Sequence, residues 1–318
     1  MASPDPKARD HGGGIDAAAA RFGGSRGDWL DLSTGINPVP YPVGALDSGA
    51  WTDLPDAGAT QALETAARAF WRVPEPAGLV AAPGASALIA AIPRLLAPGQ
   101  VKIAQPTYNE HAAAFRAAGW AVGEPGQARV VVHPNNPDGR FFAPDPGEDT
   151  GGLLVIDESF CDVTPERSLI GLAGQPGVLV LKSFGKFWGL AGLRLGFAIG
   201  DPALVARLAE RLGPWPVSGP ALVIGAQALV DTGWAAATRE RLKADAVRLD
   251  KMVGAPLVGG TGLFRLYDVA DAAQWQQALA SHRIWTRSFP YNRRWLRLGL
   301  PGNPAAWARL ALALKGLR

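Results

Sequence analysis

Short apolar runs alternate with helical patterns between residues 78 and 199 of this chain. The runs are short enough to be strands, and they cover residues 78–82, 101–104, 129–133, 153–157, 178–181 and 195–199. Between them, residues 86–96 and 109–118 show the spacing of helices, with a kink expected at Pro93. Apolar strands that alternate with helices are typical of a mainly parallel sheet covered on both faces. The sequence therefore predicts an α/β fold.

The regions on either side of this alternating part have a different texture. Residues 1–51 are rich in Gly, Pro, Asp and Ser and predict an extended arm with little regular structure. The other predicted helices are 60–71, 202–212, 220–248 and 305–317, and the other predicted strands are 263–267, 284–287 and 295–298. A chain of 318 residues exceeds what one hydrophobic core usually absorbs. We expect an N-terminal arm (1–40) that joins the small domain, a large domain (41–204) and a small α+β domain (205–318).

Composition argues against several classes of protein. The net charge is only +3, and we find no basic stripe or nucleic-acid motif. The single cysteine, Cys161, allows no disulfide within the chain and is expected to be a packed small hydrophobe. The N-terminus has no apolar signal core, and no apolar run has the length of a membrane span. We expect a cytoplasmic protein that binds small anions, and neither nucleic acid, membrane nor metal.

Lys186 lies in a glycine-punctuated loop after one of the predicted strands. Ser183 precedes it by three positions, and Arg194 follows it by eight. A lysine amine can form a Schiff base with an aldehyde, and a hydroxyl and a guanidinium can hold a phosphate. Pyridoxal 5′-phosphate (PLP) carries both groups. Taken alone, a lysine such as Lys186 is most often a solvated surface charge.

Other polar residues follow neighbouring strands, where ligands bind in sheets of this kind. Asp157 ends an apolar strand, and a buried carboxylate needs a cation such as a protonated pyridine nitrogen. The remaining candidates are an Asn-Pro-Asp-Gly turn with Asn136, an aromatic residue, Tyr108, and a turn that opens a helix, Gly84-Ala85-Ser86. Each has a simpler reading as a turn, a packed ring or a helix cap. Their joint order along the chain favours one PLP site.

This order resembles the aspartate-aminotransferase superfamily, the fold type I PLP enzymes. The resemblance implies a mainly parallel seven-stranded sheet in the large domain, a smaller α+β C-terminal domain, and a homodimer with the active site at its interface. It implies that Lys186 holds the aldehyde, that Asp157 pairs with the pyridine nitrogen and that Tyr108 stacks on the ring. Asn136 would bind the phenolic oxygen. The implied phosphate-binding residues are Gly84, Ala85, Ser86, Ser183 and Arg194.

Two segments near the chain ends are similar to the threonine-phosphate decarboxylases of cobalamin biosynthesis, a group close to the histidinol-phosphate aminotransferases. They are His11-Gly12-Gly13 with residues 29–38, and residues 285–287 with 295–302. The similarity implies that Arg297 binds the substrate carboxylate and that Arg287 assists with carboxylate or phosphate. Gly35 would allow a close approach of backbone to substrate. The segment His11-Gly12-Gly13 would close over the substrate phosphate, with a disordered tail as its alternative.

The implied reaction is decarboxylation of L-threonine O-3-phosphate to (R)-1-amino-2-propanol O-2-phosphate. A PLP-dependent aminotransferase of the histidinol-phosphate type is the alternative, because nearly the same residues serve both reactions. A regulatory PLP-binding domain without turnover is a third reading. Two positions depart from the family pattern. Phe160 replaces a tyrosine that binds the phenolic oxygen, and Leu54 replaces one that reaches the neighbouring subunit's cofactor.

Overall fold

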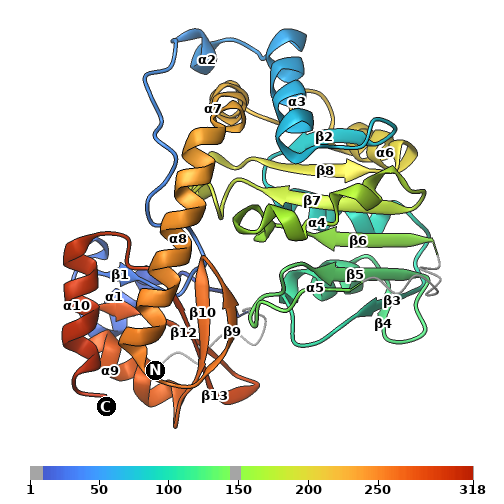
Figure 1. Ribbon diagram of the computed structural model, residues 1–318. Helices are drawn as coiled ribbons and strands as arrows, with labels where there is room; N and C mark the ends of the chain where they lie inside the picture. Colours follow the sequence, from blue (N-terminus) through green and yellow to red (C-terminus); the bar gives the residue numbers. More distant parts are fainter. Residues whose placement is uncertain (1–9, 144–151, 318) are drawn as a thin grey trace. The chain divides into compact units, whose positions relative to one another are not determined.

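The computed structural model describes residues 10–143 and 152–317, which form two compact units (Figure 1). The large unit is Pro40–Leu242, and the small unit combines Met1–Val39 with Lys243–Arg318. The chain passes from one unit to the other within the long helix α8 (Thr232–Val253). Helices α6 (Pro202–Leu212) and α7 (Gly219–Val230) belong to the large unit, because α6 packs on strand β2 (Gly78–Ala82) and α7 on helix α3 (Ala57–Trp71). The domain limits predicted from the sequence (1–40, 41–204 and 205–318) remain a prediction.

The large unit is built on a seven-stranded sheet with the strand order β2-β8-β7-β6-β5-β3-β4. Its strands are β2 (Gly78–Ala82), β3 (Gln100–Ile103), β4 (Ala121–Val122), β5 (Ala128–Val132), β6 (Leu153–Asp157), β7 (Val178–Ser183) and β8 (Gly196–Gly200). Neighbouring strands are parallel except at β8, which runs antiparallel to both β2 and β7. The predicted α/β fold with a mainly parallel seven-stranded sheet is confirmed.

The helices of the large unit are α2 (Gly49–Thr52), α3 (Ala57–Trp71), α4 (Ala85–Ala91), α5 (Asn109–Ala117), α6 (Pro202–Leu212) and α7 (Gly219–Val230). Helices α4, α5 and α6 pack on the sheet and contribute side chains to its core. Alternate strand residues such as Val130 and Val155 pack against Leu88 of α4 and Phe115 of α5. All five residues of β6 are buried, which explains its uninterrupted apolar sequence. The kink expected at Pro93 is the point where α4 gives way to a 3-10 turn (Ile92–Arg94).

The other 3-10 turns are short connections within the two units. They are η1 (Arg26–Asp28), η3 (Cys161–Val163), η4 (Pro165–Arg167), η5 (Ile170–Gly174) and η6 (Ala191–Leu193). In the part of the chain that the structure describes, no helix has both the length and the apolar character needed to cross a membrane.

The small unit joins the two ends of the chain in one structure. It contains a four-stranded antiparallel sheet of order β12-β13-β10-β9 and a parallel pair, β1 with β11. The strands are β1 (Leu30–Asp31), β9 (Leu257–Thr261), β10 (Phe264–Asp268), β11 (Ile284–Trp285), β12 (Arg287–Phe289) and β13 (Asn292–Gly299). The helices are α1 (Ile15–Phe22), α9 (Ala272–Ser281) and α10 (Pro304–Leu314).

The expectation of little regular structure before residue 51 is wrong for α1. This helix has the sequence IDAAAARF, and alanine is the best helix former. Ile15 and Ala18 lie on one helical face and pack against Trp29 and Ala280. The helix therefore forms because the C-terminal part of the small unit covers its apolar face.

Candidate functional site

Lys186 lies in the loop that follows β7, and its side chain is half-buried. Its Nζ is 5.6 Å from the centroid of the Phe160 ring, which is buried beyond the end of β6. The hydroxyl of Ser183, the last residue of β7, accepts a hydrogen bond from the backbone N–H of Gly185 at 3.2 Å. The loop therefore turns sharply after the strand, and the lysine amine faces an apolar ring.

Gly84 and Arg194 lie in direct contact at the start of α4. A Cβ added at Gly84 would lie 2.5 Å from Nη2 of Arg194, and Gly84 has a φ of +86°. The positive φ favours glycine at this position, and the absence of a side chain leaves room for the Arg194 guanidinium. The Arg194 guanidinium is exposed, and its Nη1 donates to the Ala191 carbonyl at 3.0 Å. Ala85 and the exposed Ser86 follow in the first turn of α4, so this predicted group is brought together.

Asp157 is the last residue of β6 and is 2% exposed. Its Oδ2 is 2.8 Å from Nε2 of His111. Its Oδ1 accepts hydrogen bonds from the Ser159 backbone N–H at 2.9 Å and from the Ser159 hydroxyl at 2.5 Å. Burial alone raises the pKa of Asp157, but the bonds from His111 and Ser159 outweigh it and bring the pKa below its usual value. The carboxylate is therefore held ionised in the interior.

His111 was missed by the sequence analysis. It is 2% exposed and lies in the first turn of α5, three residues after Tyr108. The ring centroids of Tyr108 and His111 are 6.0 Å apart, and the angle between the ring planes is 84°. Residues three apart in a helix share a face, so the spacing Tyr108-X-X-His111 was an available signal.

The turn that carries Asn136 follows β5 and is organised by its neighbour, Asn135. Asn135 is buried, and its Oδ1 accepts from the Thr107 hydroxyl at 2.6 Å. Its Nδ2 donates to the Pro106 carbonyl at 3.0 Å and to Asp138 at 2.8 Å. These bonds tie the Asn136 turn to the segment just before Tyr108. Asn136 itself is half-buried.

A buried ionic cluster lies directly beside Asp157 and was not predicted. Nζ of Lys182, on β7, is 2.6 Å from Oε2 of Glu158 and 3.6 Å from Oδ1 of Asp162. Asp162 also accepts from the indole N–H groups of Trp71 at 2.9 Å and Trp188 at 3.2 Å. All three charged residues are at most 4% exposed. The cluster therefore fixes the segment after β6 to β7, the strand that leads to the Lys186 loop.

His133, Glu158 and Cys161 bring possible metal ligands within 4.8 Å of one another. The ring nitrogens of His133 are both engaged, Nε2 donating to the Arg167 carbonyl at 2.7 Å and Nδ1 accepting from the Phe142 N–H at 3.0 Å. Glu158 already faces the Lys182 cation. Cys161 is fully buried, and burial raises the pKa of its thiol. The group is therefore a packed, hydrogen-bonded cluster, with Cys161 as the small buried residue expected.

Arg287 and Arg297 lie opposite each other in the small unit, as register partners of β12 and β13. Arg297 is 3% exposed, and its Nη2 donates to the Ser33 carbonyl at 2.7 Å. The pKa of Arg297 is lowered to about 9, mainly by burial and secondly by the nearby positive charge of Arg287. Arg287 donates from Nη2 to Asp10, at 2.9 Å to the carbonyl and 3.0 Å to the carboxylate oxygen Oδ2.

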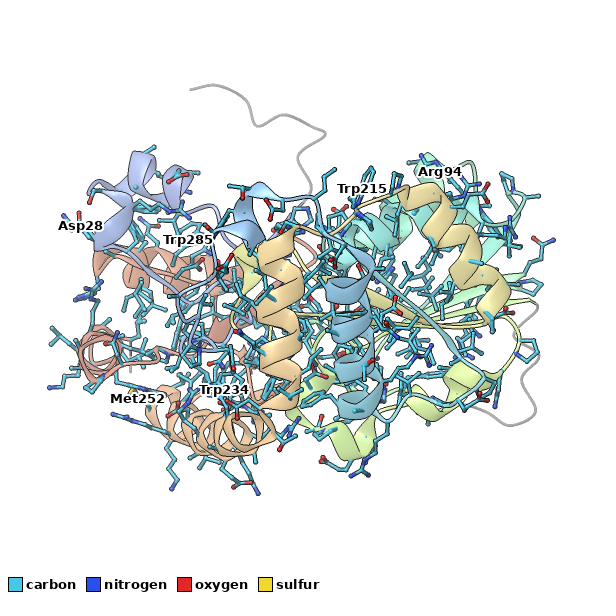
Figure 2. The ribbon with its side chains drawn as sticks, turned by 90° about the horizontal axis from the view of Figure 1, so that it is seen from above. Asp28, Arg94, Trp215, Trp234, Met252 and Trp285 are labelled. Atoms are coloured by element: carbon cyan, nitrogen blue, oxygen red, sulfur yellow. The ribbon has the colours of Figure 1, made fainter. Side chains whose placement is uncertain are left out.

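The segment His11-Gly12-Gly13 packs against residues that follow β1. The Gly13 N–H donates to the Ser33 hydroxyl at 2.6 Å, and the Gly13 carbonyl accepts from the Trp285 indole at 3.0 Å. Trp285 is labelled in Figure 2. A Cβ on Gly12 would lie 2.5 Å from the Ser33 carbonyl oxygen, so the backbone approach requires glycine. His11 is exposed, and Gly35 is buried two residues after Ser33. These contacts favour an ordered segment over the alternative of a disordered tail.

Comparisons with known proteins identify the family of this chain. Residues 124–314 match the family model of class I and II aminotransferases. Threonine-phosphate decarboxylase of Pseudomonas aeruginosa is 43% identical over 331 residues, covering 97% of this chain and 98% of that protein. The chain belongs to the class I and II aminotransferase family. A second threonine-phosphate decarboxylase, from Sinorhizobium sp, is 44% identical over 329 residues, covering 96% of this chain and 97% of that protein.

A solved structure from the aminotransferase family has the same fold. It is histidinol-phosphate aminotransferase from Sinorhizobium meliloti in complex with pyridoxal-5'-phosphate, with a TM-score of 0.77, 18% identity, and coverage of 96% of this chain and 95% of that one. The match to the family model and the two decarboxylase relatives confirm the resemblance inferred from the order of motifs.

Proposed function

We propose that this chain is a PLP-dependent decarboxylase that converts L-threonine O-3-phosphate to (R)-1-amino-2-propanol O-2-phosphate and carbon dioxide, a step of cobalamin biosynthesis. The observation that carries the proposal is identity of 43–44% with two threonine-phosphate decarboxylases over 96–97% of the chain. The alignment therefore includes the C-terminal segment that carries Arg287 and Arg297. A similarity in the cofactor region alone would support only the wider family.

The residues of the large unit fit the cofactor. The exposed Arg194 guanidinium beside Gly84, where an added Cβ would clash, is suited to a phosphate group. The phosphate would be held by Gly84, Ala85, Ser86, Ser183 and Arg194. Asp157 is ionised and buried, as a partner of a protonated ring nitrogen must be. Tyr108 would pack on the ring face, and Asn136 would donate to the phenolic oxygen.

When bound, PLP supplies an electron sink for the bond that breaks next to the substrate amine. The Lys186 amine would hold the cofactor aldehyde before substrate arrives and would later return a proton to the substrate Cα. The Phe160 ring offers no hydroxyl, so the contact with the phenolic oxygen falls to Asn136. His111 and Ser159 keep the Asp157 carboxylate charged and in place.

The two arginines of the small unit decide which bond of the substrate breaks. Arg297 would bind the substrate carboxylate, and Arg287 would assist with the carboxylate or the phosphate. His11, Gly12, Gly13 and Gly35 would complete the pocket for the phosphate. The bond held perpendicular to the cofactor ring is the one that breaks, and such orientation is a matter of sub-ångström placement. In a decarboxylase, the bond so held is Cα–COO⁻.

Carbon dioxide release tests the reaction directly. We expect the PLP-loaded protein to release carbon dioxide from L-threonine O-3-phosphate in equal amount to the aminopropanol phosphate formed. Unphosphorylated L-threonine is the matched control and should react at least about tenfold more slowly, because it lacks a charge-assisted contact. Turnover of histidinol phosphate that depends on 2-oxoglutarate, without carbon dioxide from phosphothreonine, would show an aminotransferase instead.

We further propose a homodimer, with the active site at its interface. Support comes from large apolar side chains exposed on the large unit: Trp51 and Leu54 are each 70% exposed, and Trp215 is 57% exposed. Sedimentation equilibrium should give twice the mass of one chain, and Leu54→Glu should shift it toward the monomer. Leu312→Glu, at a 60% exposed site on α10, is the matched control and should not. A monomeric wild-type protein would contradict this proposal.

A further inference from the structure

Two positive side chains lie directly opposite each other and largely out of water in the small unit. Arg287 and Arg297 are register partners in the β12–β13 pair. The Arg287 side chain is 12% exposed, and Arg297 is 3% exposed. Like charges directly opposite in a sheet repel each other, and buried charges are costly unless they are paired. The pair therefore needs an anion close by.

Asp10 supplies a negative charge to this pair. Its Oδ2 lies 3.0 Å from Nη2 of Arg287, and its carbonyl oxygen lies 2.9 Å from the same nitrogen. Asp31, a second carboxylate whose charge acts on Arg297, directs its Oδ1 to the N–H and hydroxyl of Ser33. In this structure the carboxylate placed on the Arg287 guanidinium therefore comes from the N-terminal segment.

The hydrogen bonds of Asp10 to the Arg287 guanidinium differ from those that a phosphate or carboxylate ligand can form. The hydrogen bonds from Arg287 to the carbonyl and to the carboxylate of Asp10 both leave from one guanidinium nitrogen, Nη2, whereas a phosphate or carboxylate can take two guanidinium nitrogens in parallel. The Asp10 side chain is 39% exposed, so solvent screens its charge. Water can also solvate the carboxylate once it leaves Arg287. The chain is anchored three residues later, where Gly13 is held by Ser33 and Trp285. The carboxylate can therefore swing away without loss of the anchor.

We propose that Asp10 is an intramolecular competitor for Arg287, whose carboxylate occupies the guanidinium until a phosphate or carboxylate group of the substrate displaces it. This rests on the proposed function, because it assumes an anionic substrate in the small unit. Asp10 thereby lowers the affinity of Arg287 for simple anions. A substrate that makes further contacts with the protein can still displace Asp10. Displacement also frees Asp10 at the same moment that His11, the next residue, meets the substrate.

The test is a titration of the PLP-loaded full chain with inorganic phosphate and, separately, with acetate. Asp10→Asn keeps the size of the side chain and removes its charge. We expect it to bind at least one of the two anions about two- to fivefold more tightly than the wild type, the range expected for a partly exposed ion pair. Tighter phosphate binding would assign the phosphate end of the substrate to Arg287, and tighter acetate binding the carboxylate end.

Two further variants separate competition from other effects. Asp16→Asn removes an exposed carboxylate on α1 that pairs with Arg26 at 2.9 Å, and it should bind both anions as the wild type does. Asp10→Glu keeps the charge and should also stay close to the wild type. Unchanged or weaker anion binding by Asp10→Asn would overturn the proposal, as would an equal gain in Asp10→Glu. Because the titration needs no turnover, its failure is distinct from a failure to release carbon dioxide.

Discussion

Lys186→Ala is expected to lower kcat with phosphothreonine by a factor of about 10³ or more, because we propose that this amine both holds the cofactor aldehyde and donates the proton. Lys186 lies in a loop after β7, half-buried beside the Phe160 ring, so its truncation removes little packing. The variant should therefore unfold at nearly the wild-type temperature. Steady-state kinetics, the absorbance of bound cofactor and a thermal melt measure the three effects.

Lys102→Ala is the matched control for Lys186→Ala. Lys102 belongs to the same unit, and its Nζ forms an ion pair with Glu124 at 3.4 Å near the surface. Its removal should leave kcat within about twofold, since exposed pairs contribute little. If Lys186→Ala kept a tenth of the wild-type rate, the assignment of Lys186 as the cofactor lysine would be wrong.

Lys182→Met is expected to reduce the free energy of unfolding by about 3–5 kcal/mol, because it leaves the buried Glu158 and Asp162 carboxylates without their cation. Lys182 is 2% exposed, with its Nζ 2.6 Å from Glu158 and 3.6 Å from Asp162. Urea unfolding, followed with the cofactor content matched between proteins, measures the loss. Lys102→Met should cost no more than about 1 kcal/mol.

The pH dependence of this loss has a defined sign. Burial lowers the pKa of Lys182, but Glu158 and Asp162 more than compensate, so the net pKa is raised. A raised lysine pKa contributes stability that is fully present below the unfolded value of about 10.4 and disappears only above the folded one. The difference between Lys182→Met and the wild type should therefore be constant between about pH 7 and 9. A loss below 1 kcal/mol, or one that vanishes at pH 9, would contradict a charged, buried Lys182.

The strand pattern of the large unit was predictable because each strand is an apolar run with clear ends. The predicted strand 153–157 coincides with β6, and the predicted strand 78–82 coincides with β2. The placement of Asp157 at a strand end and of Lys186 in a loop after a strand followed from the same pattern. This part of the site was readable because parallel strands place their carboxyl ends at one edge.

What could not be predicted depends on contacts between distant segments. In the sequence, Lys182 is one polar residue after an apolar run. Its ion pair with Glu158 depends on the pairing of β7 with β6, which the sequence alone does not show. Asp10 lies 277 residues from Arg287 along the chain, and nothing local marks the two as a pair. The helix α9 was missed because its sequence, AAQWQQALAS, has a weak apolar pattern between two short strands.

The pairing of β1 with β11 has a consequence for the order in which this protein can fold during synthesis. Leu30 pairs with Ile284, so one partner leaves the ribosome long before the other exists. At about 5–20 residues per second, the N-terminal strand waits on the order of ten seconds or more for its neighbour. The large unit, continuous from Pro40 to Leu242, can complete its sheet during that interval. The cofactor pocket would thus be finished first, and a nascent chain could hold its cofactor before it can recognise a substrate.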